Sequence, residues 1–193
     1  DFVVMNQNTG FETSATTPGL SANWIGANLS GDSRKCNKPN KGKFYAYTLN
    51  CAFVFVGGAG EASSIKQVYN NFGATILDSG SVLDYSMMIQ APTVLNLKLK
   101  VKIAFTAGGK ATLINTAFTA PDADYTHYVG GGFVVPQDVK KITIILLNTA
   151  ASGKVNVDNL ILQEVDLFFA PGRGTRDVLP APVAPAGFRL AGG

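Results

Sequence analysis

Apolar and polar residues alternate through much of the chain. In the clearest run, residues 95–103, Leu, Val and Ile take every second position, and Asn or Lys fills the positions between them. Successive side chains of a β-strand point to opposite faces, so this run predicts a strand with one buried face and one lysine-bearing face in water. Gly108-Gly109 then predicts a hairpin turn into the next run, residues 111–118.

Other short apolar runs are separated by turns rich in Gly, Pro, Asn and Asp. No window of about a dozen residues combines a helical period with capping residues, and the chain has no repeat of fixed period. This pattern predicts an all-β fold, a single antiparallel β-sandwich. The predicted strands are 2–5, 51–56, 61–69, 82–90, 94–105, 111–118, 128–135, 139–147 and 154–162.

The last predicted strand, 154–162, contains a break in its pattern. Apolar side chains alternate in one phase up to Val157 and in the other phase from Leu160, and the phase shifts at Asp158-Asn159. The stretch therefore predicts a strand that a polar pair interrupts and that closes the folded body.

The length of 193 residues predicts one domain, which we place at residues 1–166. From residue 167 on, alternating prolines exclude a central strand and favour an extended tail. We expect this tail, 167–193, to pack on a neighbouring subunit. Its apolar anchors would be Phe168, Phe169, Val178, Leu179, Val183, Phe188 and Leu190.

The composition is 46% hydrophobic and only 15% charged, which is typical of exported or assembled proteins. The net charge of +3 is too small and too dispersed to predict a nucleic-acid partner. No apolar run reaches the roughly 18 residues that a transmembrane helix requires. The chain opens at Asp1 with an apolar run, so a removed signal peptide and an extracellular or cell-surface location are expected, with trimming as the other explanation.

Cys36 and Cys51 flank a basic, turn-rich stretch, 34–43. An even cysteine count in an exported chain favours a disulfide, and two reduced, buried thiols are the alternative. The basic stretch predicts a solvated hairpin held by the bridge, although it could also dock a phosphate or an acidic polymer.

The residues name no reaction. His127 is the single histidine, no serine lies in a Gly-x-Ser-x-Gly elbow, and turn chemistry explains Asp122 and Asp124 better than a glycosidase pair does. The glycine run 57–60 lacks the Lys-Ser/Thr ending of a phosphate-binding loop. We therefore predict that the protein is not an enzyme.

Short motifs at both ends of the predicted domain resemble a known family. Asn8-Thr9-Gly10-Phe11-Glu12, a later Trp24 and the closing segment 155–160 are similar to the galactose-binding-like jelly rolls, which include many carbohydrate-binding modules of exported bacterial proteins. The resemblance implies that the first and last strands are neighbours. It also implies a structural calcium ion, held by the Glu12 and Asp158 carboxylates with backbone carbonyls near Gly10. A bulge in which Asp158 caps backbone amides is the alternative.

Two non-catalytic functions fit these features. We favour an extracellular structural subunit that forms filaments or a surface layer, in which the tail or a sheet edge contacts the next copy head to tail. The alternative is a carbohydrate-binding module that stacks sugars on exposed aromatic rings. The candidate rings belong to Trp24, Tyr45, Tyr47, Tyr125 and Tyr128, although Trp24 is better explained as a plug at the end of the core. Asn28-Leu29-Ser30 is a formal glycosylation sequon.

Overall fold

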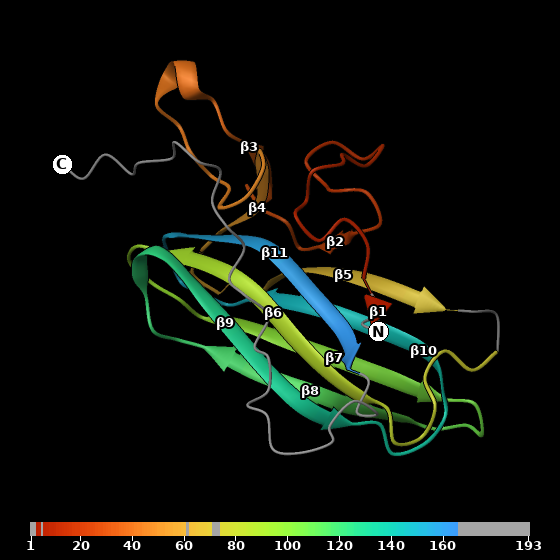
Figure 1. Cartoon of the computed structure of the whole chain (residues 1–193). Coiled ribbons are helices and arrows are strands. Elements are labelled where there is room, and N and C mark those ends of the chain that lie inside the picture. The colour runs from red at the N-terminus through yellow and green to blue at the C-terminus, as the bar shows by residue number, and fades with distance from the viewer. Residues whose placement is uncertain (1–2, 5, 61, 71–73, 166–193) are drawn as a thin grey trace, which may run out of the picture.

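Two antiparallel sheets stack face to face in the computed structural model, which describes residues 3–4, 6–60, 62–70 and 74–165 (Figure 1). The 6-stranded β11 sheet has the order β3-β4-β11-β6-β9, and β1 also pairs with β11. The 5-stranded β10 sheet has the order β2-β5-β10-β7-β8. The strands are β1 (Val3–Val4), β2 (Ile25–Ala27), β3 (Ser33–Cys36), β4 (Cys51–Val56), β5 (Ser63–Asn70), β6 (Val82–Ala91), β7 (Leu97–Phe105), β8 (Lys110–Phe118), β9 (Asp122–Val134), β10 (Val139–Asn148) and β11 (Lys154–Val165).

The core lies between the two sheets and follows the alternation in the sequence. Leu97, Leu99, Val101 and Ile103 of β7 are buried, whereas the lysines between them face outward from the β10 sheet. Within the described residues, helical structure is limited to the short 3-10 segment η1 (Pro39–Lys41). The all-β, jelly-roll sandwich predicted from the sequence is confirmed. The described residues contain no helix of the length and apolar character that a membrane crossing requires.

Strand β11 is central, and its partners change at the predicted break. On one side its first half pairs with β4 and its second half with β1, while β6 follows it on the other side. The pairing with β6 shifts between Asp158 and Ile161, and Asn159 has a φ of 50°, so the polar pair forms a β-bulge. The side chain of Asn6 bridges the bulge, because it donates a hydrogen bond to the Leu160 carbonyl and accepts one from the Leu162 backbone N–H. The first and last strands are therefore neighbours, as the resemblance implied.

Two short strands and the first part of a third were not predicted. β2 and β3 are too short to show an alternation of their own, and they form because longer strands offer them an edge. β9 begins at Asp122 rather than at residue 128, since its first residues are polar and largely exposed and so carry no apolar signal. The predicted tail, 167–193, and all its anchors lie outside the described residues, so the domain boundary at 166 stays a prediction.

Phe53 tests the core. Its ring is fully buried and lies 4.9 Å from the ring of Phe55 and 6.0 Å from that of Phe11, measured between centroids. We expect Phe53→Ala to lower the free energy of unfolding by about 3–5 kcal/mol, because it removes this packing and leaves a cavity. Urea unfolding measures the loss. The control Val134→Ala, at a position 58% exposed, should change it by less than about 0.5 kcal/mol, and equal losses would contradict this core assignment.

Candidate functional site

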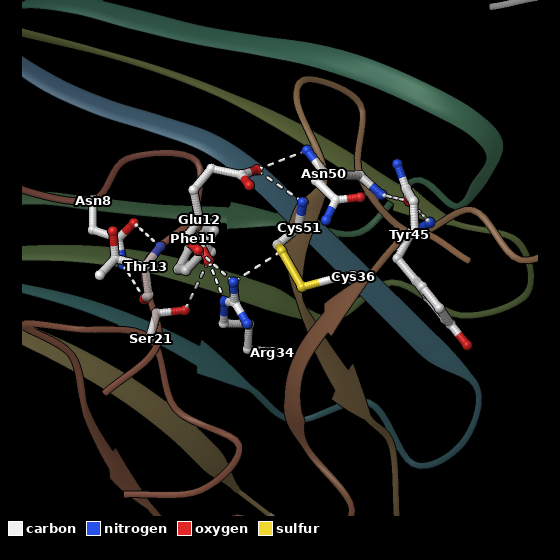
Figure 2. The surroundings of a disulfide bond; sticks show 12 residues. Asn8, Phe11, Glu12, Thr13, Ser21, Arg34, Cys36, Tyr45, Asn50 and Cys51 are labelled. Carbon is white, nitrogen blue, oxygen red and sulfur yellow. Dashed lines mark hydrogen bonds between the residues drawn. A yellow bond between two sulfur atoms is a disulfide. The ribbon is translucent and has the colours of Figure 1, made fainter. Parts of the chain in front are cut away.

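The predicted disulfide joins Cys36 of β3 to Cys51 of β4 at paired positions (Figure 2). The cysteines are 15 residues apart, and a bridge across a loop of this size stabilises a protein by roughly 3 kcal/mol in the chain-entropy model. The loop that it closes contains η1 and Lys38, Lys41 and Lys43 of the basic stretch, which are exposed as predicted.

Arg34 is the exception in the basic stretch, because it is half-buried and turned toward the N-terminal loop. Its Nε donates to the Phe11 carbonyl at 2.6 Å, and its Nη2 donates to the Glu12 carbonyl and lies 3.0 Å from the Cys51 sulfur (Figure 2). The prediction of a wholly solvated hairpin is therefore wrong for Arg34. Arg34 is the second residue of β3, a strand that the sequence did not predict, and its place in that strand points the side chain toward the N-terminal loop.

Glu12 braces the start of β4. Its Oε1 accepts the backbone N–H groups of Asn50 at 3.0 Å and of Cys51 at 2.8 Å (Figure 2). A carboxylate that accepts two amide donors replaces the water that those amides would otherwise bind.

Asp158 braces the same loop from the bulge of β11, where it is fully buried. Its Oδ2 accepts the backbone N–H groups of Tyr47 at 2.9 Å and of Thr48 at 2.8 Å, and its Oδ1 accepts that of Asn159 at 2.7 Å. Burial raises the pKa of Asp158 to about 6, although these hydrogen bonds act in the opposite direction. This is the capped bulge that the sequence left open as the alternative to a metal site.

Glu12, Asp158 and Gly10 do come together, as the resemblance implied. A Cβ placed on Gly10 would lie 3.7 Å from Asp158 Oδ1 and 3.9 Å from Glu12 Oε1. Calcium takes about 6–8 oxygen ligands, and two carbonyls next to this group, those of Phe11 and Glu12, already accept hydrogen bonds from the cationic Arg34. The described residues also hold no group of three or more acidic, His or Cys side chains able to bind a metal. Calcium binding stays a prediction.

The predicted aromatic platforms do not form one surface. Trp24 is only 3% exposed and packs 5.4 Å from the Phe11 ring, so it plugs the core and offers no sugar a face. Tyr128 packs edge-on against Phe118, with ring centroids 4.9 Å apart. The structure thus separates both from the remaining tyrosines.

Tyr45, Tyr47 and Tyr125 gather on the outer side of the β11 sheet as a clasp. The Tyr47 and Tyr125 rings lie 5.5 Å apart, and the Tyr125 hydroxyl donates to the Tyr45 carbonyl. Burial, and to a lesser degree the charge of Asp158, raise the pKa of Tyr125 and keep that donor protonated. These contacts hold the 37–50 loop to β9, so the rings serve packing first.

Ser86 and His127 form a pair that the sequence did not reveal, because they lie on different strands. Ser86 Oγ is 2.9 Å from His127 Nε2. Ser86 is buried in the middle of β6, between β11 and β9, and among the described residues no carboxylate hydrogen-bonds His127 to orient it. The pair lacks the third member and the exposed nucleophile that hydrolysis requires.

An open hollow of about 410 Å³ lies on the outer face of the β10 sheet. Ala104 of β7 is paired with Lys141 of β10 on one side and Lys110 of β8 on the other, so a small side chain lies between two long ones. The sequence did not predict this site, since its residues come from three strands whose register only the fold supplies. The lining consists of Lys102, Ile103, Ala104, Lys110, Ala111, Thr112, Lys141 and Thr143.

No protein-family model matches the chain, and no curated protein matches it. Solved structures do match its fold. A family 61 carbohydrate-binding module in complex with β-1,4-galactotriose has a TM-score of 0.55 at 14% identity, covering 84% of this chain and 99% of that one. The CBM22-1 xylan-binding domain from Paenibacillus barcinonensis has a TM-score of 0.54 at 15% identity, covering 81% and 92%.

A third match is part of a larger protein. The enzymatically active domain of tailspike protein 4 of bacteriophage CBA120 has a TM-score of 0.59 at 12% identity. The match covers 84% of this chain and only 22% of the phage domain. At these identities the similarities show a shared fold, the jelly roll of carbohydrate-binding modules.

These matches correct the function that we favoured from the sequence. The filament or surface-layer prediction is contradicted, because several of the matched structures are carbohydrate-binding modules. The low charge and the alternating prolines after residue 166 are features of the sequence that are not specific to assembling subunits. The findings instead favour the alternative, a carbohydrate binder.

Replacing Arg34 tests whether its hydrogen bonds to the Phe11 and Glu12 carbonyls stabilise the fold. We expect Arg34→Gln to lower the free energy of unfolding by about 1.5–3 kcal/mol, because hydrogen bonds to a charged group are lost. The control Lys35→Gln makes the same charge change one residue away, at an exposed position, and should have little effect. Equal losses in urea unfolding would contradict this role for Arg34.

Thermal unfolding of the unmodified protein tests whether it binds calcium. Since Arg34 already supplies a positive charge at these carbonyls, we expect the same Tm in excess EDTA and in excess calcium chloride. A ligand that binds only the folded state raises stability by mass action. A fall of Tm in EDTA that added calcium reverses would therefore contradict this expectation and support calcium binding.

Proposed function

We propose that this protein is a non-catalytic carbohydrate-binding module that binds a glycan in the hollow of the β10 sheet. The hollow carries the proposal, because it joins an open depression to converging ammonium and hydroxyl groups that can hydrogen-bond a ligand.

The matches support the class of ligand. One solved structure of the same fold is a complex with β-1,4-galactotriose, and another is a xylan-binding domain. Both are matched over at least 92% of their own length, so the resemblance extends over each module as a whole.

The chemistry of the hollow suits a sugar chain. Thr143 and Thr112 flank Lys102 in the next row of the sheet, and their hydroxyls both donate and accept hydrogen bonds. Farther along the same face, Ile145 and Leu147 are half-buried and leave an apolar strip for the C–H face of a pyranose ring. A glycan needs both kinds of contact, since its rings have polar edges and apolar faces.

The absence of catalysis and an extracellular setting belong to the same proposal. The structures of this fold that support it are mostly binding modules. The Cys36–Cys51 disulfide favours an oxidising compartment, because cytosolic proteins rarely keep such bonds.

Filling the hollow tests the proposed site. Ala104→Ile adds bulk between Lys141 and Lys110, so retention of the protein in gels that contain polysaccharide should weaken by about tenfold, a loss of roughly 1.4 kcal/mol. The control Ala59→Ile makes the same change at an exposed loop position and should bind normally. Affinity electrophoresis against a panel including xylan, β-1,4-galactan and acidic polysaccharides makes the comparison. Retention by none of the polysaccharides, or equal retention of both variants, would contradict the proposal.

A further inference from the structure

The outer face of the β10 sheet concentrates positive charge. Side chains on this face alternate with core residues, which fixes their outward direction. Its lysines are Lys66, Lys98, Lys100, Lys102, Lys110 and Lys141. The chain as a whole has a net charge of only +3, so the fold gathers onto one face a charge that the sequence disperses.

The described strands that form this face carry no negative charge. The five strands of the β10 sheet contain neither Asp nor Glu. The acid next to the sheet in sequence, Asp138, precedes β10 and accepts the Ser79 backbone N–H at 2.9 Å. Soluble surfaces usually intersperse both signs, and an acid-free sheet face departs from that pattern.

The lysines around the hollow are arranged to meet one anion together. Lys141 and Lys110 are each paired with Ala104, and Lys102 lies two residues before Ala104 on the same strand. Lys102 is thus a diagonal neighbour of both, about 7–8 Å away on the sheet. No lysine is directly opposite another, because alanine and threonine lie between them. The three ammonium groups therefore border a single hollow without direct like-charge pairs.

Edge protection does not account for these residues. Lysines often blunt an exposed sheet edge, which suits Lys110 on the edge strand β8. Lys102 and Lys141, however, lie on β7 and β10, which have neighbours on both sides.

Resting on the carbohydrate-binding function above, we propose that the hollow takes an acidic polysaccharide, whose carboxylate or sulfate groups bind Lys102, Lys110 and Lys141. A polysaccharide suits the face better than a nucleic acid does. Proteins that bind single strands stack the bases on aromatic rings. Of the aromatic side chains of these strands, Phe105 and Phe118 are buried, and Tyr69, which is 40% exposed, is paired with the core residue Ile142 and so lies on the side away from the lysines.

The experiment compares two triple variants with equal charge change. Lys102, Lys110 and Lys141 are replaced by Gln in one, and the exposed loop residues Lys38, Lys41 and Lys43 in the other. The probes are polygalacturonate for carboxylates, dextran sulfate for sulfates, and neutral β-1,4-galactan and xylan. Three ion pairs of about 0.5 kcal/mol each predict a roughly tenfold loss of affinity for the acidic polymer in the first variant, measured by isothermal titration calorimetry.

The loop variant should bind like the unmodified protein. Replacing the three sheet lysines by Arg should keep the affinity, because the charge is kept, and unchanged Tm values show that all variants are folded. Affinity should also fall as sodium chloride rises, since salt screens exposed charges.

The outcomes separate the two proposals. Binding of neutral galactan or xylan that the sheet variant does not weaken would overturn the acidic-ligand inference and leave the carbohydrate-binding function standing. Binding of no polysaccharide at all would overturn both. Lysine-dependent binding of single-stranded DNA or phosphatidylserine vesicles, without binding of acidic polysaccharide, would assign the face to another class of partner and overturn the inference.

Discussion

The structure depends on one buried carboxylate at a break in its central strand. Asp158 is fully buried where β11 changes partner from β4 to β1, and it accepts the backbone amides of Tyr47 and Thr48. A buried charge of this kind is tolerated only when donors surround it. Those donors come from the loop before β4, so the hydrogen bonds that stabilise the buried Asp158 carboxylate also hold this loop in place.

As a result, the outer faces of the two sheets differ in how far the chain itself covers them. The outer side of the β11 sheet is engaged by the chain itself, through Asp158, the tyrosine clasp and the Ser86–His127 pair. The outer side of the β10 sheet carries the open hollow around Ala104 and the acid-free row of lysines. The face that we propose for a ligand is therefore the one that carries this hollow, and not the one that the described parts of the chain already cover.

Sequence reasoning succeeded where the signal is local. The alternation in residues 95–103 predicted β7 and its wet lysine face, and the phase shift at Asp158-Asn159 predicted the bulge. The sequence did not predict features that depend on which residues the strands bring opposite one another. Lys110 and Lys141 lie far apart in the sequence and become neighbours of Ala104 only through strand pairing. The burial of Trp24 was the favoured expectation and the fold agrees with it, whereas the separation of Tyr128 from Tyr45, Tyr47 and Tyr125 appears only once the strands are paired.

NMR mapping of ligand contacts tests the central claim most directly. Backbone amide shifts would be followed while an acidic galacturonate oligosaccharide is added to the isotopically labelled protein. We predict that the largest, saturable shifts cluster on β7, β8 and β10 around Ala104. Shifts that cluster instead around Tyr45, Tyr47 and Tyr125 on the β11 sheet would contradict it and place the ligand on the opposite face.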